Sequence, residues 1–250
     1  MKRIALMVIK LIWIAPYWFF QIWSWGKNDR HTEAEKFALL KKITKNANRA
    51  GRVTIDAHGI ENLPEKMGYV MFPNHQGMFD VLSLLECCPH PFTVVMKKEV
   101  SNIFFVKQIR ILMKAQAIDR EDIRASVAVI RQMTKEVLEG RNYVIFAEGT
   151  RSRQQNQVQE FKGGTFKSAI NAKCPIVPVA LIDSYKPFDT RSIEKVTVQV
   201  HFLPPLYYEE YKGMKSLEIA AEVQRRIQVT IRQNENKSGA GASAANVRKK

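Results

Sequence analysis

The residues best suited to chemistry are a histidine and an aspartate, His75 and Asp80, in the segment PNHQGMFD (73–80). A neutral imidazole can take a proton from a hydroxyl near neutral pH, and a carboxylate can hold its tautomer and stabilise the imidazolium that forms. Their spacing corresponds to about 140° around a regular helix, so the two side chains cannot share a helical face. We therefore expect His75 in a loop and a helix that begins after it and returns Asp80 to the ring, with Gly77 permitting the bend.

A histidine and an aspartate at this spacing also arise by chance, because the chain has 5 histidines. The alternative interpretation of His75 is a loop histidine that hydrogen-bonds to backbone. Two further polar clusters therefore matter, AIDR (117–120) and FAEGTRSR (146–153). Each follows an apolar run, as the histidine segment does.

The two later clusters contain arginines suited to phosphate. The guanidinium of Arg120 or Arg151 is a fork that matches two phosphate oxygens. Gly149 lets the backbone approach a ligand closely, and Glu148 can orient Arg151 or receive a substrate hydroxyl. Judged alone, Arg120 is an exposed residue or a partner of its acidic neighbours, and Glu148 and Arg151 form a local ion pair. These alternatives stay open at this point.

The pattern around the clusters predicts an α/β domain, because strands alternate with helices. Short apolar runs predict strands at 52–58, 69–72, 92–96, 116–118, 143–146, 176–181 and 196–202. Apolar residues at helical spacing, or a short helix-like run, predict helices at 31–49, 81–87, 121–138, 165–172 and 217–232. We expect a layered, mostly parallel sheet flanked by helices, with the polar clusters at the carboxyl ends of strands, where such domains place their chemistry.

Residues 1–26 predict contact with a membrane. They read MKRIALMVIKLIWIAPYWFFQIWSWG, with no small-residue cleavage site after the apolar run. Lys10 interrupts the run, Pro16 should kink or break a helix, and the charge-free remainder is shorter than the roughly 20 residues that a spanning helix needs. Tryptophan and tyrosine favour the bilayer interface. We expect a helix that dips into one leaflet rather than a full span, and the alternative is a buried core helix.

The helix predicted at 31–49 has a narrow apolar stripe surrounded by lysines, which suits a bilayer surface. The alternative is an ordinary surface helix of the domain. The sequence thus divides into an N-terminal two-helix membrane-associating motif (1–50), an α/β domain (51–234) and a small, polar, basic tail (235–250) that we expect to be disordered.

The charge limits the classes of possible partner, and the cysteine content limits the possible metal sites and the compartment. The formal net charge of +15 favours a polyanion, which could be nucleic acid, an anionic bilayer or an acidic carrier. We see no recognition-helix or RNA-binding motif, so we expect no nucleic acid partner. Cys87, Cys88 and Cys174 form no C-x-x-C pair, which argues against a metal site or a disulfide framework and favours a reducing compartment.

Taken together, the clusters resemble the glycerophospholipid acyltransferase family, the group that contains 1-acylglycerol-3-phosphate acyltransferases. The family's motifs occur here in the family's order, as NHQGMFD (74–80), AIDR (117–120), FAEGTRSR (146–153) and CPIVPVAL (174–181). Lys97 begins a KKE triplet that is similar to the K-x-E of the family. Gly77 replaces the usual serine and Ala147 the usual proline, and both departures put substrate preference in doubt.

The resemblance implies transfer of a fatty acyl group from an acyl-CoA or acyl-carrier-protein thioester to the sn-2 hydroxyl of lysophosphatidic acid, which gives phosphatidic acid for phospholipid synthesis. His75 would deprotonate the hydroxyl, which attacks the thioester directly, and Asp80 would orient His75. The resemblance implies no metal or other cofactor. The expected substrate-binding residues are Lys97, Arg120, Glu148, Gly149, Thr150 and Arg151.

The resemblance also implies a monotopic protein of the cell membrane, with the catalytic domain on the cytoplasmic side, bound to an anionic lipid surface. Two alternatives stay open. The acceptor could be glycerol 3-phosphate or another lysophospholipid, or the chain could be a non-catalytic membrane-binding protein.

Overall fold

The sheet is the frame that positions the site. A computed structural model describes residues 2–119 and 122–235. Arg120 and the predicted tail from residue 236 onward lie outside the described residues. Seven strands form one sheet in the order β1-β7-β6-β2-β5-β3-β4, and only β6 and β7 pair antiparallel. The strands are β1 (Val53–His58), β2 (Val70–Pro73), β3 (Thr93–Lys97), β4 (Gln116–Ile118), β5 (Tyr143–Val144), β6 (Ile176–Ile182) and β7 (Val196–Phe202). The predicted α/β class with a mostly parallel sheet is confirmed.

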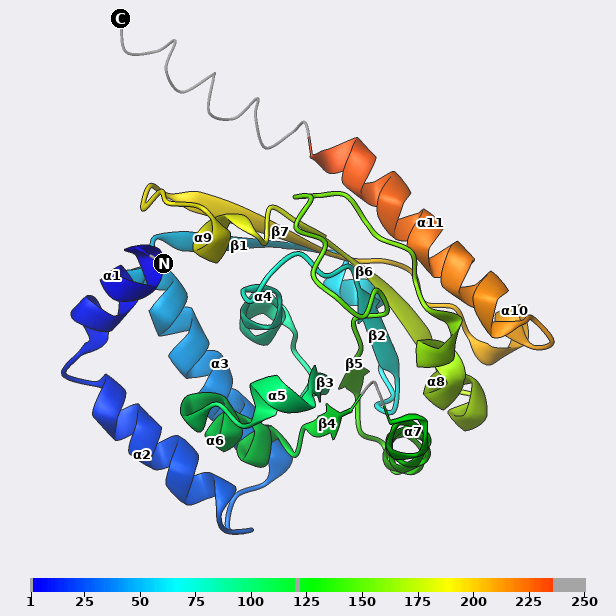
Figure 1. The fold of residues 1–250 in the computed structure, drawn as a ribbon, viewed down its shortest axis with the longest axis horizontal. Helices are drawn as coiled ribbons and strands as arrows, with labels where there is room; N and C mark the ends of the chain where they lie inside the picture. The colour runs from blue at the N-terminus through cyan, green and yellow to red at the C-terminus, as the bar shows by residue number, and fades with distance from the viewer. Residues whose placement is uncertain (1, 120–121, 236–250) are drawn as a thin grey trace, which may run out of the picture.

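Helices cover both faces of this sheet (Figure 1). The helices are α1 (Lys2–Leu11), α2 (Ala15–Gly26), α3 (Glu33–Ala50), α4 (Asp80–Cys87), α5 (Lys98–Ser101), α6 (Phe104–Met113), α7 (Ile123–Leu138), α8 (Lys167–Ala172), α9 (Lys186–Asp189), α10 (Tyr208–Tyr211) and α11 (Ser216–Asn234), with short 3₁₀ turns at Ile60–Asn62 and Gly163–Phe166. Sequence patterning predicts neither α5 nor α6, because their exposed and buried apolar residues do not separate into one stripe.

The central strand β2 shows how the two layers of core are built. Val70 and Phe72 pack with α7, α8 and α11 on one face, and Met71 packs with α3, α4 and α6 on the other. A strand that is covered on both faces reads as a continuous apolar run rather than an alternating one. All residues of β6 are buried for the same reason.

The N-terminal region contains three helices where the sequence analysis predicts two. The chain turns by 90° between α1 and α2 at residues 12–14, just before Pro16. Proline lacks an N–H and suits the first turn of a helix, so α2 starts afresh there. Among the described residues, no single helix has the length and hydropathy to cross a bilayer, and only the bent pair α1–α2 meets these criteria when taken together.

Helix α1 is attached to the domain by a buried guanidinium. Arg3 is almost fully buried and donates hydrogen bonds to the backbone carbonyls of four residues. These acceptors are Gly51, Pro187, Ser192 and Glu194. Helix α1 thus joins the end of α3 to the segment that precedes β7.

Helix α3 behaves as a helix of the domain. Thr32 and Glu35 form a capping box at its start, and Phe37 and Leu40 are buried in the core beneath the sheet. The apolar stripe of this helix, which the sequence analysis predicts to face a bilayer, therefore packs against the core of the protein. The exposed apolar residues of the N-terminal region lie instead on α1, α2 and the turn between them.

Candidate active site

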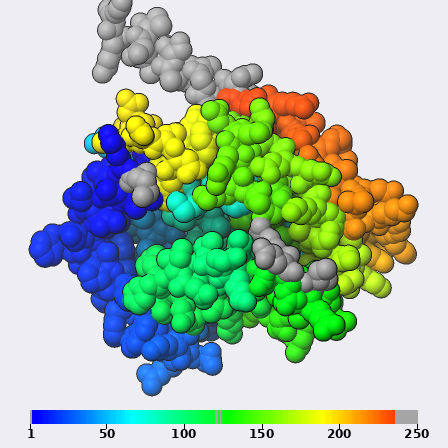
Figure 2. All heavy atoms as spheres, viewed as in Figure 1, coloured from blue at the N-terminus to red at the C-terminus, as the bar shows by residue number. Residues whose placement is uncertain are grey.

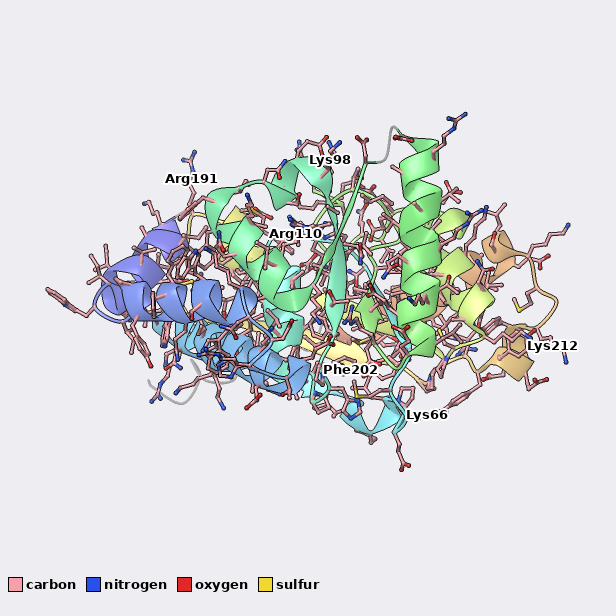
Figure 3. The ribbon with its side chains drawn as sticks, turned by 90° about the horizontal axis from the view of Figure 1, so that it is seen from below. Lys66, Lys98, Arg110, Arg191, Phe202 and Lys212 are labelled. Atoms are coloured by element: carbon pink, nitrogen blue, oxygen red, sulfur yellow. The ribbon has the colours of Figure 1, made fainter. Side chains whose placement is uncertain are left out.

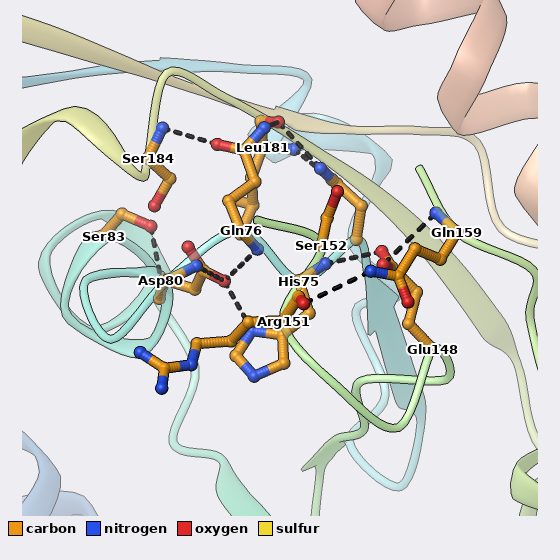
Figure 4. A network of polar contacts seen from close by, with 12 residues as sticks. His75, Gln76, Asp80, Ser83, Glu148, Arg151, Ser152, Gln159, Leu181 and Ser184 are labelled. Carbon is orange, nitrogen blue, oxygen red and sulfur yellow. Dashed lines mark hydrogen bonds and ion pairs between the residues drawn. The ribbon is translucent and has the colours of Figure 1, made fainter. Parts of the chain in front are cut away.

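The predicted acid–base pair forms one hydrogen-bonded unit at the carboxyl end of β2 (Figure 4). His75 follows shortly after the end of β2 and lies in a loop, and Asp80 is the first residue of α4. The distance from His75 Nδ1 to Asp80 Oδ2 is 2.7 Å. The Asp80 side chain is fully buried, whereas 21% of the His75 side chain is exposed. The helix therefore begins after the histidine and returns the aspartate to it, as the spacing predicts.

The Asp80 carboxylate is fixed by more than the imidazole. Its Oδ2 also accepts the backbone N–H groups of Gln76, at 2.7 Å, and Gly77, at 3.0 Å. Its place in the first turn of α4 is favourable for a negative charge, because helix N-termini carry a partial positive charge. A carboxylate held in this way keeps Nδ1 of His75 as the donor, so Nε2 carries the lone pair.

A phenylalanine sets the plane of the histidine ring. The rings of His75 and Phe146 stack with their centroids 4.2 Å apart. With Nδ1 bonded to Asp80 and one ring face on Phe146, the imidazole has little rotational freedom. Its exposed edge, which includes Nε2, is the part available to a ligand.

Glu148 holds the backbone of the histidine. Its Oε1 accepts the N–H of His75 at 2.8 Å, and its Oε2 accepts the N–H of Gln159 at 3.2 Å. Burial raises the pKa of Glu148 to about 7, the bonds from the two N–H groups act against this, and the charge of Asp80 adds to the rise. Among the described side chains no ion pair joins Glu148 to Arg151, so the local pair considered from sequence does not form.

The loop after Glu148 wraps around His75. Ser152 donates its N–H to the carbonyl of His75 at 2.8 Å, so the histidine backbone is held on both its donor and its acceptor side. Gly149 has a φ of +78° and a Cβ there would lie 3.1 Å from Lys162 Nζ, a backbone conformation that favours glycine. Thr150 Oγ1 contacts Gln159 Oε1 at 3.2 Å.

Two amide side chains that sequence reasoning missed connect the histidine loop to β6. Asn74 donates to the carbonyl of Leu181 at 3.0 Å and accepts its N–H at 2.7 Å. Gln76 accepts the N–H of Ser184 at 2.7 Å and donates to Asn156 Oδ1 at 2.8 Å. Both amides are buried. The sequence signal is the run of polar residues, NHQ, directly after a buried strand.

The cationic side chains lie around this core of the site. Arg151 is exposed, and its side chain runs past the His75 ring in Figure 4. Lys97 ends β3, and its Nζ lies 3.0 Å from Glu99 Oε1. Figure 3 shows Lys98 beyond the carboxyl end of β3, with Lys66 at the opposite end of the sheet. Arg120, the other predicted phosphate ligand, lies outside the described residues.

The structure thus brings His75 and Asp80 together with the loop that contains Glu148, Gly149 and Arg151, and it places Lys97 at the end of β3, which β5 separates from β2. The unit formed by the histidine and aspartate can accept a proton from a hydroxyl at Nε2 and return it later in a reaction. Among the described residues, no group of three or more histidine, cysteine or acidic side chains is placed to hold a metal ion.

Comparison with known proteins gives one consistent result. The family model described as Acyltransferase matches residues 54–182, which contain the whole histidine loop and the segment 146–153. The chain is 29% identical over 170 residues to a 1-acyl-sn-glycerol-3-phosphate acyltransferase of Borreliella burgdorferi, covering 67% of this chain and 68% of that protein. It is 26% identical over 185 residues to the alpha form from Mus musculus, covering 72% of this chain and 64% of that protein.

A solved structure shows the same fold. The crystal structure of the 1-acyl-sn-glycerophosphate acyltransferase PlsC from Thermotoga maritima superposes with a TM-score of 0.70 at 19% sequence identity. The superposition covers 91% of this chain and 96% of that chain. The superposed part is therefore longer than the segment that the family model matches.

Proposed function

The chain belongs to the acyltransferase family, and from this premise we propose that it moves a fatty acyl group from a thioester to the sn-2 hydroxyl of lysophosphatidic acid. The product is phosphatidic acid, for phospholipid synthesis. The relatives named above are acyltransferases of this acceptor, which supports the choice. The observation that carries the chemistry is the 2.7 Å contact between His75 Nδ1 and Asp80 Oδ2.

In the proposed reaction, Nε2 of His75 takes the proton of the acceptor hydroxyl. The hydroxyl oxygen attacks the thioester carbonyl, and a tetrahedral oxyanion forms. When the carbon–sulfur bond breaks, the imidazolium returns its proton to the leaving thiolate, so charges and atoms balance. Asp80 stabilises the imidazolium between the two transfers. The thioester supplies an activated acyl group, and the donor is an acyl-CoA or an acyl carrier protein.

Phosphate binding is assigned to cations beside the histidine. Arg151 is exposed and directly precedes Ser152, whose N–H bonds to the carbonyl of His75, and a guanidinium binds two phosphate oxygens at once. Arg120 is proposed as its counterpart, and Lys97 is proposed to stabilise the oxyanion. Gly149 and Thr150 shape the loop that presents Arg151, and Glu148 fixes the backbone of His75.

We further propose that the protein binds the cytoplasmic side of the cell membrane as a monotopic protein. The turn between α1 and α2 exposes Trp13, 94% of which is accessible, and α2 exposes Tyr17, Phe20 and Trp23. These aromatic rings suit the boundary between headgroups and acyl chains. The net charge of +15 favours an anionic surface.

The test of the proposed reaction is release of free thiol from an acyl thioester in the presence of lysophosphatidic acid. His75→Ala should lower turnover by about 10²- to 10⁴-fold, the usual contribution of a general base. The matched control is His58→Ala, which removes a second histidine that contacts an aspartate, Asp56, at 3.0 Å on β1. Full activity of the His75 variant, or equal losses in both variants, would contradict the proposal.

A panel of acceptors tests the choice of substrate. Lysophosphatidic acid, glycerol 3-phosphate and an unphosphorylated monoacylglycerol should be acylated at very different rates, with the first preferred. Arg151→Ala should raise the KM for lysophosphatidic acid, because it removes a phosphate contact, and should change the KM for the unphosphorylated acceptor little. Preference for the unphosphorylated acceptor would exclude the arginine as a phosphate ligand.

A further inference from the structure

A second exposed apolar surface lies outside the N-terminal helices. Val100, Ile103, Phe104 and Phe105 lie where α5 passes into α6, and each is exposed, with 71% of Phe104 accessible. Single exposed apolar side chains are ordinary, but four within six residues form a patch of the kind that marks a binding surface. We call these four residues the α5–α6 patch.

The α5–α6 patch is continuous with α2. The Phe19 ring on α2 stacks with Phe104 and Phe105, at centroid distances of 5.3 and 6.2 Å. The same helix exposes Phe20 and Trp23. Residues some 85 positions apart in sequence, Phe19 and Phe104, thus build one apolar surface. In Figure 2 the blue-green α5 and α6 stand on the near face of the molecule, beside the blue N-terminal helices.

Positive charges border this surface. Lys107 is exposed one turn after Phe104, and Lys98, which is 62% exposed two residues before Val100, pairs with Asp119 at 3.3 Å. On the α2 side, Lys27 Nζ lies 3.9 Å from the centre of the Trp23 ring. Aromatic and aliphatic side chains bordered by lysines fit the interface of a bilayer that contains anionic lipid.

The α5–α6 patch is also attached to the site. Helix α5 begins directly after Lys97, the last residue of β3, and β3 pairs with β5, which leads into the segment around Glu148. The position of α5 is therefore fixed relative to the carboxyl edge of the sheet, where His75 lies. A membrane contact at the α5–α6 patch would thus also set the position of the imidazole relative to the membrane.

We propose that the α5–α6 patch is a second bilayer-inserting element, used together with α2, which holds the His75 site against an anionic lipid surface. This inference rests on the proposed function only for the statement that the acceptor comes from that surface. Insertion at two places fixes the orientation of the domain on the bilayer. If only the α1–α2 pair were inserted, the domain could still rotate about that pair. The acceptor then enters the site from the leaflet, without passing through water.

The experiment measures the lipid concentration that binds half of the full-length protein. The vesicles contain phosphatidylglycerol and phosphatidylcholine, or phosphatidylcholine alone. The double variant Phe104→Ser, Phe105→Ser should need at least about tenfold more anionic lipid, because two phenylalanine side chains no longer enter the bilayer. The matched control is Leu138→Ser, Leu217→Ser, which alters residues of similar exposure, 68% and 66%, on α7 and α11, and should bind as the wild type does.

A second variant guards against a folding defect. Ile103→Asp changes no stacked ring and adds a negative charge, so it should weaken binding to anionic vesicles more than binding to neutral ones. Turnover of a short-chain, water-soluble acceptor should stay unchanged in both variants, while turnover of vesicle-borne acceptor falls. Unchanged vesicle binding in both variants would overturn the proposal.

Two further outcomes are distinguishable. A wild-type dimer that becomes monomeric in the Phe104 and Phe105 variant, with unchanged vesicle binding, would assign the patch to a second copy of the chain and overturn the proposal. Vesicle binding is measured without turnover. If the protein binds vesicles through the α5–α6 patch but acylates no acceptor, the proposed reaction is wrong and the inference about the patch stands.

Discussion

Among the described residues, the pair His75–Asp80 can be compared with a second contact between a histidine and an aspartate, His58–Asp56, which lies in a different environment. His75 and Asp80 lie at the carboxyl edge of the sheet, with the aspartate fully buried. His58 and Asp56 lie on β1, where each side chain is about half exposed. Water screens the exposed pair, although the His58 ring stacks on that of His201 with their centroids 4.5 Å apart. In the buried pair two backbone N–H groups also bind the aspartate, which holds it in the defined geometry that a directed proton transfer requires.

Two buried glutamates show the same contrast at opposite ends of the sheet. Glu136 on α7 is bonded by Arg141, Gln132 and the hydroxyl of Tyr143. Burial alone would raise the pKa of Glu136, but these bonds and the charge of Arg141 lower it. Glu148 meets only neutral N–H groups and the like charge of Asp80, and its pKa rises to about 7. Glu136 thus pairs with a cation, Arg141, whereas Glu148 has no cationic partner among the described side chains.

The largest expected effect separates the two histidine–aspartate pairs. Asp80→Asn should lower kcat/KM by about 10³-fold, because an amide can hold the wrong tautomer of His75 and cannot stabilise the imidazolium. Asp56→Asn should leave kcat/KM unchanged within about twofold, as expected for an exposed pair. Steady-state thiol release measures both. Equal effects would show that burial of the aspartate is not what distinguishes the pairs.

The second effect concerns the amino end of the sheet. Arg141→Ala removes the cation that Glu136 and Glu33 share, so a mostly buried carboxylate is left uncompensated. The free energy of unfolding should fall by about 3 to 4 kcal/mol, measured by denaturant titration. The kcat/KM of the folded fraction should stay at the wild-type value. Lost activity in a fully folded variant would show that this network reaches the site.

The third effect is a pH dependence that belongs to Glu148. Its pKa lies near 7 in the folded protein and near its ordinary value of 4.5 in the unfolded chain, so the folded state binds more protons between these values. The stability that Glu148 contributes should therefore fall as pH rises from 4.5 to 7 and stay level above 7, by about 3 kcal/mol in total. Denaturant titrations of the wild type and Glu148→Gln across this range give the difference.

Activity should change in the opposite sense. Below pH 7 a protonated Glu148 can no longer accept both N–H groups, so the backbone of His75 loses one of its supports. The kcat/KM of the wild type should fall as the pH drops below 7, because Glu148 becomes protonated there. Glu148→Gln should have a lower kcat/KM at pH 7 and above and should lack the part of the fall that Glu148 causes. An unchanged profile would show that Glu148 stays ionised throughout.

The smallest effect compares two glycines of the site. A Cβ on Gly77 would lie 2.8 Å from Asp189 Oδ2, the end of a flexible side chain that can move. Gly77→Ala should therefore change kcat/KM by less than about threefold. Gly149 has a φ of +78°, so Gly149→Ala should cost about 1 to 2 kcal/mol of stability. A large loss in the Gly77 variant would show that Asp189 is held in place.

Sequence patterning predicts the sheet well because its core strands are covered on both faces. The run at 176–181, for example, corresponds to β6 at Ile176–Ile182. The spacing of His75 and Asp80 also defines their local geometry, since the link between them is short. Patterning is less informative for α6, where Phe104 and Phe105 are exposed while Leu112 is buried, so that apolar character does not report burial.

The supports of the site are beyond local sequence reasoning. Gln76 contacts Asn156 across 80 positions and Ser184 across 108, and these contacts exist only once the sheet brings β2 and β6 together. The motif around Glu148 predicts a role in substrate binding, and the fold adds that its oxygens accept the N–H groups of His75 and Gln159. A buried carboxylate with backbone partners cannot be told from a ligand-binding one until the chain is folded.

The guanidinium of Arg3 changes what a shortened version of this protein would be. Trimming the first 26 residues would remove the hydrogen-bond donors of four backbone carbonyls, at Gly51, Pro187, Ser192 and Glu194. It would also open the gap that Met7 fills against Gly51. Helix α1 is thus an integral part of the folded domain, and a truncated chain would lose the contacts that join the end of α3 to the segment before β7.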